Sequence, residues 1–342
     1  MCIYLKNKEG LCYEKQEHVL PAALGCCTKL DKGIVSDQAN EYFSPIERDV
    51  IKNSFIQIPR IIDGPGKRGK LSPKYATTSN VMVIEHGGET CLGYMKGEKG
   101  YILDQFVIRK LNDIQFIPHS IESDVQKSID FLKEKIVNMK DKYVPVDLLH
   151  NVSESIFFTF YDGKIHIGYS GELPQKKLDD IIDVFRNEFT QRKMKLVEGG
   201  ISGILEVKEN IINISKVVAK SAVNTLAFLK GAECIKRTTD FEAIIKKIFS
   251  ENDEILSVVS TMENADIAKQ SFKLKDDQQA CLIFCEGKKL TSWVFFYNRL
   301  WEVELCDNLS MSFELIFDGI VCDWKNRRDY RYQEYLESQK NN

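Results

Sequence analysis

The composition of residues 59–80 constrains the fold of this chain more than any other feature. The segment reads PRIIDGPGKRGKLSPKYATTSN and concentrates glycine, proline and lysine. Proline removes a backbone donor and glycine weakens helices and strands, so we expect no long helix or strand to run through it. The sequence therefore predicts a basic linker at 59–80, between a small N-terminal module, residues 1–58, and a larger domain, residues 81–342.

The N-terminal module has the pattern of two strands followed by helices. Mixed apolar stretches at 2–5 and 11–20 flank the turn-like KNKEG and predict a β-hairpin. Ser36 is a good N-cap for a first helix. The run SPIE at 44–47 has the form of a capping box with proline at the first helical position, and it predicts a second helix after it.

The larger domain mixes both kinds of pattern. Strands are expected within 81–117 and 155–169 and in a three-stranded meander at 280–285, 289–297 and 300–306, and amphipathic periodicity predicts helices at 121–140, 174–192, 215–231 and 240–250. The expected fold class is therefore α+β, with a small ββα module followed by a larger mixed α+β domain whose pattern does not reveal its role.

Composition restricts the setting of the protein. No apolar stretch is long enough to cross a membrane, and the N-terminus does not resemble a signal peptide, so we expect a cytoplasmic protein without a membrane partner. The 10 cysteines then predict reduced thiols. The net charge is −3, but residues 1–80 carry twelve Lys and Arg against nine Asp and Glu, a weak sign of a local polyanion site.

Residues 17–40 concentrate side chains suited to hydrolysis. Glu17 and His18 stand just before Pro21, and Asn40 follows a loop. A neutral imidazole has a pKa near the operating pH and suits a general base, whereas carboxylate and amide oxygens suit a hard cation such as Mg²⁺. Neighbours on a regular strand point to opposite faces, so Glu17 and His18 can share a site only at a strand end or bulge, which Pro21 favours.

The run EHVLP at 17–21, the ALG at 23–25 and Asn40 together resemble the HNH, or ββα-metal, endonuclease family. The resemblance covers roughly residues 1–55, and it extends more loosely through GPGKRGK at 64–70 and into Lys216–Gly231. It implies a DNA endonuclease, with RNA not excluded, in which His18 is the general base and Glu17 and Asn40 hold Mg²⁺ or Mn²⁺. It also implies a setting such as bacterial defence against phage.

The chain departs from this family at the zinc-binding positions. Many members carry two CxxC pairs beside the site, and the matching positions here are Cys2 with Leu5 and Ser36 with Ala39. One thiolate cannot hold a tetrahedral zinc, so we expect no structural zinc. The segment is in this respect similar to the HNH domain of RNA-guided CRISPR nucleases. The further upstream Asn of that domain has no counterpart at 31–33.

Several further interpretations of the sequence stay open. Lys67, Arg68 and Lys70 suit contacts to a phosphate backbone, although so short a basic run is more often a solvated linker. The module is alternatively a degenerate HNH fold that binds nucleic acid or a protein without cutting. A metabolic or sensor role carried by residues 81–342 is a third possibility, and a homo-oligomer or an activating partner is left open.

Overall fold

The architecture is taken from a computed structural model of the whole chain. The structure describes residues 1–66, 69–111, 113–120, 124–139, 142–148, 154–188, 193–194, 201–204, 209–310 and 317–340.

The chain is a mixed α+β protein, as expected, and it forms two compact units. Unit 1 comprises Met1–Thr77 and Val207–Asn342, and unit 2 comprises Thr78–Glu206. This division differs from the ranges expected from the sequence, because residues 207–342 belong with the N-terminal residues rather than with 81–206. A local pattern cannot reveal such a pairing, since the contacts that create it join distant parts of the chain.

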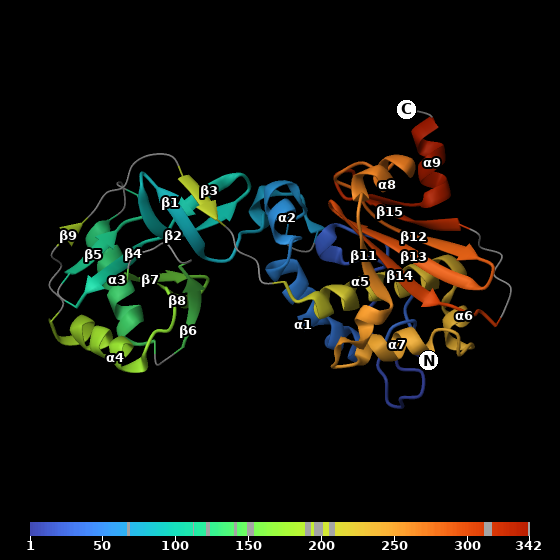
Figure 1. Cartoon of the computed structure of the whole chain (residues 1–342), viewed down its shortest axis with the longest axis horizontal. Coiled ribbons are helices and arrows are strands. Elements are labelled where there is room, and N and C mark those ends of the chain that lie inside the picture. The colour runs from blue at the N-terminus through green and yellow to red at the C-terminus, as the bar shows by residue number, and fades with distance from the viewer. Residues whose placement is uncertain are drawn as a thin grey trace. The chain divides into compact units, whose positions relative to one another are not determined.

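Unit 1 is built on one antiparallel sheet with the strand order β11-β14-β13-β12-β15-β16 (Figure 1). Its strands are β11 (Val259–Met262), β12 (Gln279–Glu286), β13 (Lys289–Phe296), β14 (Arg299–Cys306), β15 (Phe317–Asp323) and β16 (Arg328–Arg331). The expected meander is confirmed, because β12 pairs with β13 and β13 with β14 in neighbouring antiparallel ladders.

Helix α5 (Ile211–Lys230) lies at the centre of unit 1, between this sheet and the N-terminal residues. Every residue from 214 to 227 is buried. Alternate residues of a strand face opposite sides, so Cys281 and Ile283 of β12 pack in the α5 core, whereas Ala280 and Leu282 pack on the other face. The smaller helices of this unit are α6 (Ala232–Lys236), α7 (Glu242–Phe249), α8 (Ala265–Ser271), α9 (Tyr332–Lys340), and the 3-10 turn Asp253–Ser257.

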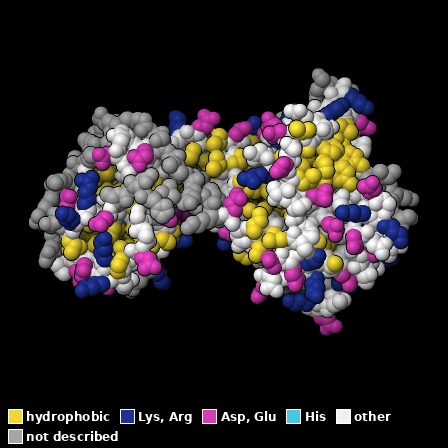
Figure 2. Space-filling model, viewed as in Figure 1, with side chains coloured by type: hydrophobic (Ala, Val, Ile, Leu, Met, Phe, Trp, Pro, Cys, Tyr) yellow, Lys and Arg dark blue, Asp and Glu magenta, His cyan; other side chains and the backbone are white. Residues whose placement is uncertain are grey.

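The outer face of the sheet carries a second, aromatic core. Phe272, Phe284, Trp293, Phe317 and Tyr332 contact one another there, beside α8 and α9. Figure 2 shows hydrophobic side chains gathered over β12 and β15 next to these two helices. The sheet is therefore packed on both faces, although α8 and α9 leave several of these rings half-buried.

The N-terminal residues are less regular than expected. No strand forms within residues 1–35, and the hairpin between 2–5 and 11–20 is wrong: the amide of Ile3 donates to Ile34 O, at 3.0 Å. The one β-bridge of this segment joins His18 to Lys29. The segment at 2–5 is buried, so its apolar pattern reflects packing in the core of unit 1 rather than strand pairing.

One helix replaces the two that were expected at 36–53. Helix α1 (Asp37–Asn53) begins at Ser36, whose hydroxyl accepts from the amide of Ala39, which confirms the predicted N-cap. It continues through Pro45, which lies on the exposed side. Phe43 and Val50 are both buried on the inner side, so packing holds the helix together across the proline.

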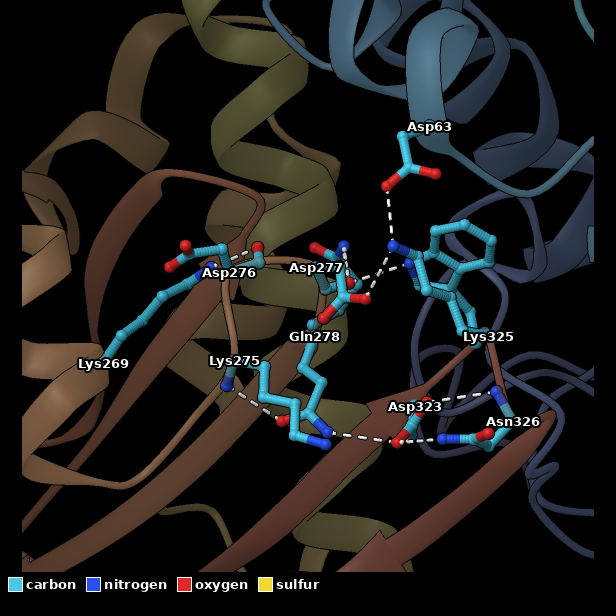
Figure 3. Close-up of polar contacts among 11 residues, drawn as sticks. Asp63, Lys269, Lys275, Asp276, Asp277, Gln278, Asp323, Lys325 and Asn326 are labelled. Carbon is cyan, nitrogen blue, oxygen red and sulfur yellow. Dashed lines mark hydrogen bonds and ion pairs between the residues drawn. The ribbon is translucent and has the colours of Figure 1, made fainter.

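Helix α2 (Gln57–Asp63) occupies the first residues of the expected linker, and the 3-10 turns Ala22–Leu24 and Pro73–Tyr75 are short. A polar network fixes the end of α2 in unit 1 (Figure 3): the ammonium of Lys325 lies 2.7 Å from Asp63 and 3.1 Å from Asp277. The carboxylate of Asp323 accepts from Gln278 and Asn326 in the same region. The loop after α2 is thereby anchored to the β15–β16 turn.

Unit 2 has three layers. Its sheets have the orders β10-β1-β2-β3 and β6-β8-β7-β4-β5-β9. On β4, Phe106 and Ile108 pack against helices α3 and α4, whereas Val107 packs toward Cys91 and Leu92 of the smaller sheet. The elements are β1 (Met82–His86), β2 (Glu89–Lys96), β3 (Lys99–Ile102), β4 (Gln105–Lys110), β5 (Asp113–Ile117), α3 (Val125–Val137), β6 (Tyr143–Asp147), β7 (Ile156–Tyr161), β8 (Lys164–Tyr169), α4 (Gln175–Asp183), the π-helical turn Val184–Glu188, β9 (Lys193–Met194) and β10 (Ile201–Ile204).

Candidate functional site

A buried ion-pair cluster surrounds the first predicted site residue. The ammonium of Lys220, in α5, lies 2.7 Å from Oε1 of Glu17 and 2.6 Å from Oε1 of Glu47, in α1. Only 3% of the Lys220 side chain is exposed, against 13% of Glu17 and 26% of Glu47. Two carboxylates therefore share one cation in a largely water-excluded site.

The charged groups of this cluster shift one another's pKa values unequally. Burial alone would lower the pKa of Lys220, but the Glu47 and Glu17 carboxylates raise it above its ordinary value. Burial raises the pKa of Glu17, and Lys220 opposes that rise while Glu47 adds to it. The asymmetry follows from the count of charges, because Lys220 has two partners whereas the two carboxylates share one.

The backbone of His18 is held by the same helix, α5. Its carbonyl accepts from the side-chain amide of Asn224, at 3.0 Å, and the hydroxyl of Tyr4 donates to the Asn224 carbonyl oxygen, at 2.7 Å. Asn224 lies one turn after Lys220 on α5, so a single helix face contacts both Glu17 and His18. The adjacent residues of the pair are thus fixed by separate side chains.

The imidazole of His18 is suited to accept a proton. Burial lowers its pKa below the ordinary value, and the nearby Lys29 ammonium lowers it further. Glu47 and Lys220 lie close enough to act on it with opposite signs. The neutral form therefore dominates at neutral pH, and this is the form that a general base requires.

Asn40 lies on the first turn of α1, and its backbone amide donates to Ser36 O at 3.1 Å. Its side-chain oxygen is buried and accepts no hydrogen bond from the residues that the structure describes. Asn40 and Glu47 are about two turns apart on one side of α1. Buried amide oxygens without a donor are rare in folded proteins, and a ligand atom is one way to satisfy them.

Two of the four positions that the HNH resemblance matches to zinc ligands, Cys2 and Ser36, lie in contact. The sulfur of Cys2 accepts from both the amide and the hydroxyl of Ser36, each at 3.4 Å, and the Ser36 hydroxyl caps Ala39. Neutral hydrogen bonds hold this corner together. Within the described ranges, no group of three or more His, Cys, Asp or Glu side chains is placed to hold a metal ion.

The residues expected to contact nucleic acid lie after α2. Lys67 and Arg68 fall outside the described residues. Lys70 is exposed, and its ammonium lies 4.1 Å above the ring of Tyr75. The structure thus brings Glu17 next to Lys220 and Glu47, and it places Lys70 on a separate loop.

Sequence reasoning missed three members of this site: Glu47, Lys220 and Asn224. The two α5 residues carried a signal, since Lys216, Lys220 and Asn224 repeat at intervals of four within a largely apolar helix. A polar stripe on such a helix usually faces solvent, but here all three residues are buried. Only the position of Glu17, 203 residues away along the chain, reveals the reason.

Comparison with protein-family models, with curated proteins and with solved structures finds no match for this chain. Among the described residues, no helix is both long and apolar enough to span a bilayer. The functional conclusion therefore depends on the residues themselves.

Proposed function

We propose that unit 1 is a metal-dependent endonuclease of the HNH type that hydrolyses phosphodiester bonds in DNA, with His18 as the general base. The observation that carries the proposal is the half-buried imidazole of His18, whose pKa burial lowers and which lies within electrostatic range of Glu47 and Lys220. In this role His18 removes the proton from a water molecule as its oxygen attacks phosphorus and the bond to the leaving oxygen breaks.

A divalent cation fits this site only in part. The buried side-chain oxygen of Asn40 suits Mg²⁺ or Mn²⁺, which prefer oxygen ligands. Glu17 is the other residue that would hold the ion, but its carboxylate is already paired with Lys220. When bound, such an ion would neutralise charge on the phosphate and on the leaving oxygen. Lys220 is therefore a competitor for the same carboxylate.

The same ion pair favours a second candidate function. A chain in which Lys220 permanently replaces the cation would bind DNA, RNA or a protein partner without cutting it. The ammonium of Lys220 is hydrogen-bonded to two carboxylates. Displacing it would leave a buried charge without a partner, which destabilises the fold. A cytoplasmic role in defence against phage is compatible with either candidate and is proposed on the resemblance alone.

Plasmid cleavage separates the two candidates. The full chain is incubated with supercoiled DNA and Mg²⁺ or Mn²⁺, beside an EDTA control and the variants His18→Ala and Asn40→Ala. The control variants are Lys8→Ala, at an exposed residue of unit 1, and Asn53→Ala, at the end of α1. Nicking that is lost with EDTA, His18→Ala and Asn40→Ala but kept in both controls supports the nuclease.

A gel shift at low salt completes the test. DNA binding without cleavage in any of these reactions favours the non-cutting candidate. Cleavage that survives His18→Ala contradicts the assignment of the base, whatever its metal dependence.

A further inference from the structure

Unit 2 contains a cavity of about 380 Å³ that the function proposed for unit 1 does not use. Pockets for small ligands commonly span about 300–1,000 Å³, so its size fits a compact molecule. It lies among β1, β2, β3, β7, α3 and the loops before β4 and after β5. We call it the aromatic pocket, and the side chains used below are Tyr94, Tyr101, Asp104, His119, Phe131 and Phe160.

One wall of the aromatic pocket is a ladder of tyrosine rings. Tyr94 stacks on Tyr161, with centroids 4.6 Å apart, and on Tyr101, with centroids 5.3 Å apart and planes only 13° from parallel. Tyr101 is the last ring of the ladder and is 39% exposed. A stack that ends in an accessible ring offers a platform for one more planar ring.

A second aromatic pair lines the same cavity. Phe131 of α3 and Phe160 of β7 pack edge to face, with centroids 5.4 Å apart. Phe131 is 46% exposed, which is unusual for a phenylalanine on a helix that otherwise buries its apolar face. The pocket therefore presents accessible aromatic surface from two elements.

The polar groups of the pocket form a fixed hydrogen-bonding edge. Nδ1 of His119 lies 2.9 Å from Oδ1 of Asp104, and the His119 amide donates to the same oxygen at 2.7 Å. The carboxylate thereby assigns Nδ1 as the donor and leaves Nε2 as the ring nitrogen that can meet a ligand. Half of the His119 side chain is exposed. Such an edge suits the rim of a heterocycle that carries both donors and acceptors.

Charge disfavours an alternative ligand for the aromatic pocket, which is a cation bound over Phe131 and Phe160. The ammonium of Lys135 already lies 5.0 Å from the Phe131 centroid and 5.9 Å from the Phe160 centroid. A second cation over these rings would meet Coulomb repulsion, and Asp104 is already paired. Unit 2 as a whole carries sixteen Lys and Arg against twenty Asp and Glu, so a long polyanion is also disfavoured.

We propose that the aromatic pocket binds a nucleobase carried by a free nucleoside or nucleotide, with the base stacked on Tyr101 and its edge bonded to His119. This assignment is independent of the nuclease proposal, because every residue of the pocket lies in unit 2.

Binding of nucleosides to the full chain tests the proposal. Adenosine, guanosine, cytidine and uridine are each titrated by calorimetry up to about 1 mM, beside ribose and choline. We expect saturable binding of at least one nucleoside with one site per chain. Tyr101→Ala should weaken it by about 5- to 150-fold, which is the range for losing one base–aromatic stack. Tyr101→Phe, which keeps the ring, should bind like the parent chain.

Leu111→Ala serves as the matched control, because Leu111 is an exposed apolar residue of unit 2 outside the aromatic pocket. Unchanged melting curves show that each variant is folded. The proposal is overturned if no nucleoside binds, if Tyr101→Ala binds as tightly as Leu111→Ala, or if choline binds in place of the nucleosides. Tighter binding of a single-stranded oligonucleotide than of its mononucleotide would overturn the assignment to a free nucleotide.

Discussion

At the scale of single residues, Lys220 decides the electrostatics of unit 1. It is the only charged group that contacts both Glu17 and Glu47 among the described ion pairs. Buried ion pairs contribute little net stability compared with apolar packing, but breaking one leaves an uncompensated charge. The energetic role of Lys220 is therefore to make the burial of two carboxylates tolerable.

Lys220→Met should destabilise the protein strongly. Methionine fills most of the space of the lysine side chain but leaves Glu17 and Glu47 without their cation, and we expect a loss of about 3–5 kcal/mol in the free energy of unfolding. Denaturant titration measures it. Adding Glu17→Gln and Glu47→Gln to Lys220→Met should recover most of the loss, because no charge is then left buried. If Lys220→Met alone is as stable as the parent chain, Lys220 and the two carboxylates are not energetically coupled.

The titration of His18 is a second prediction at this scale. Histidine NMR should find a pKa below the ordinary 6.5, because burial and the Lys29 ammonium disfavour the charged form. Lys29→Ala should move that pKa upward, whereas Lys8→Ala, an exposed lysine outside this group, should leave it unchanged. A downward shift in Lys29→Ala would contradict the assignment.

The pH dependence of stability follows with a definite sign. Since the native pKa of His18 is lowered, the unfolded chain binds its proton first as the pH falls. The stability that neutral His18 contributes is therefore present above pH 6.5 and decreases as the pH falls from 6.5 toward the native value. Lys220 acts at alkaline pH. Because its pKa is raised in the native state, the stability that the charged ammonium contributes is lost as the pH rises through that pKa.

At the scale of elements, the loop between His18 and Lys29 is clamped against the β15–β16 turn. The carboxylate of Asp329 accepts from the amides of Cys27 and Thr28, at 2.7 and 2.6 Å. Gly25 approaches Trp324 so closely that a Cβ at this glycine would lie 2.2 Å from the Trp324 Cβ. The loop that follows His18 is thus positioned by the C-terminal strands rather than by a regular hairpin.

Gly25→Ala and Gly33→Ala form a matched pair that measures this clamp. Both glycines have positive φ, +96° and +95°, so each alanine pays a similar backbone strain of about 1–2 kcal/mol. Only Gly25→Ala also meets Trp324, whereas the space at Gly33 is open. We expect Gly25→Ala to be the less stable variant in denaturant titration, by at least about 1 kcal/mol. Equal stabilities would mean that the loop is not held against Trp324.

At the scale of the whole molecule, unit 2 is inserted between the two segments that make unit 1. Unit 2 has its own hydrophobic cores on both faces of its larger sheet, and the described strands of each sheet pair within the unit. The core of unit 1, in contrast, combines side chains from residues 2–56 with those of α5 and β12–β15. The two units therefore differ in whether one continuous segment suffices to fold them.

Fragments should reveal this difference. Residues 78–206 expressed alone should melt cooperatively by circular dichroism, because their core is complete. Residues 1–58 alone should show no cooperative transition, since α5 covers their apolar side. Joining 1–77 to 207–342 through a flexible linker should restore folding of unit 1. A cooperative melt of residues 1–58 would support an independent N-terminal module instead.

Much of the local structure was predictable from the sequence. The meander at 279–306, the N-cap at Ser36 and helices α3 and α5 follow from periodicities and capping rules that act over a few residues. The N-terminal hairpin was not, because the apolar residues at 2–5 are explained by burial in the core of unit 1 rather than by pairing with a neighbouring strand.

What the sequence determined by itself was the class of fold, most of the helices and strands, and the choice of Glu17, His18 and Asn40 as candidates, whose roles stay predictions. Only the tertiary structure decided that Lys220 and Asn224 contact Glu17 and His18, and that residues 207–342 complete unit 1. The physical reason is range. Hydrogen-bond periodicity and capping act between near neighbours, whereas these contacts close loops of about 200 residues and depend on the packing of the entire core.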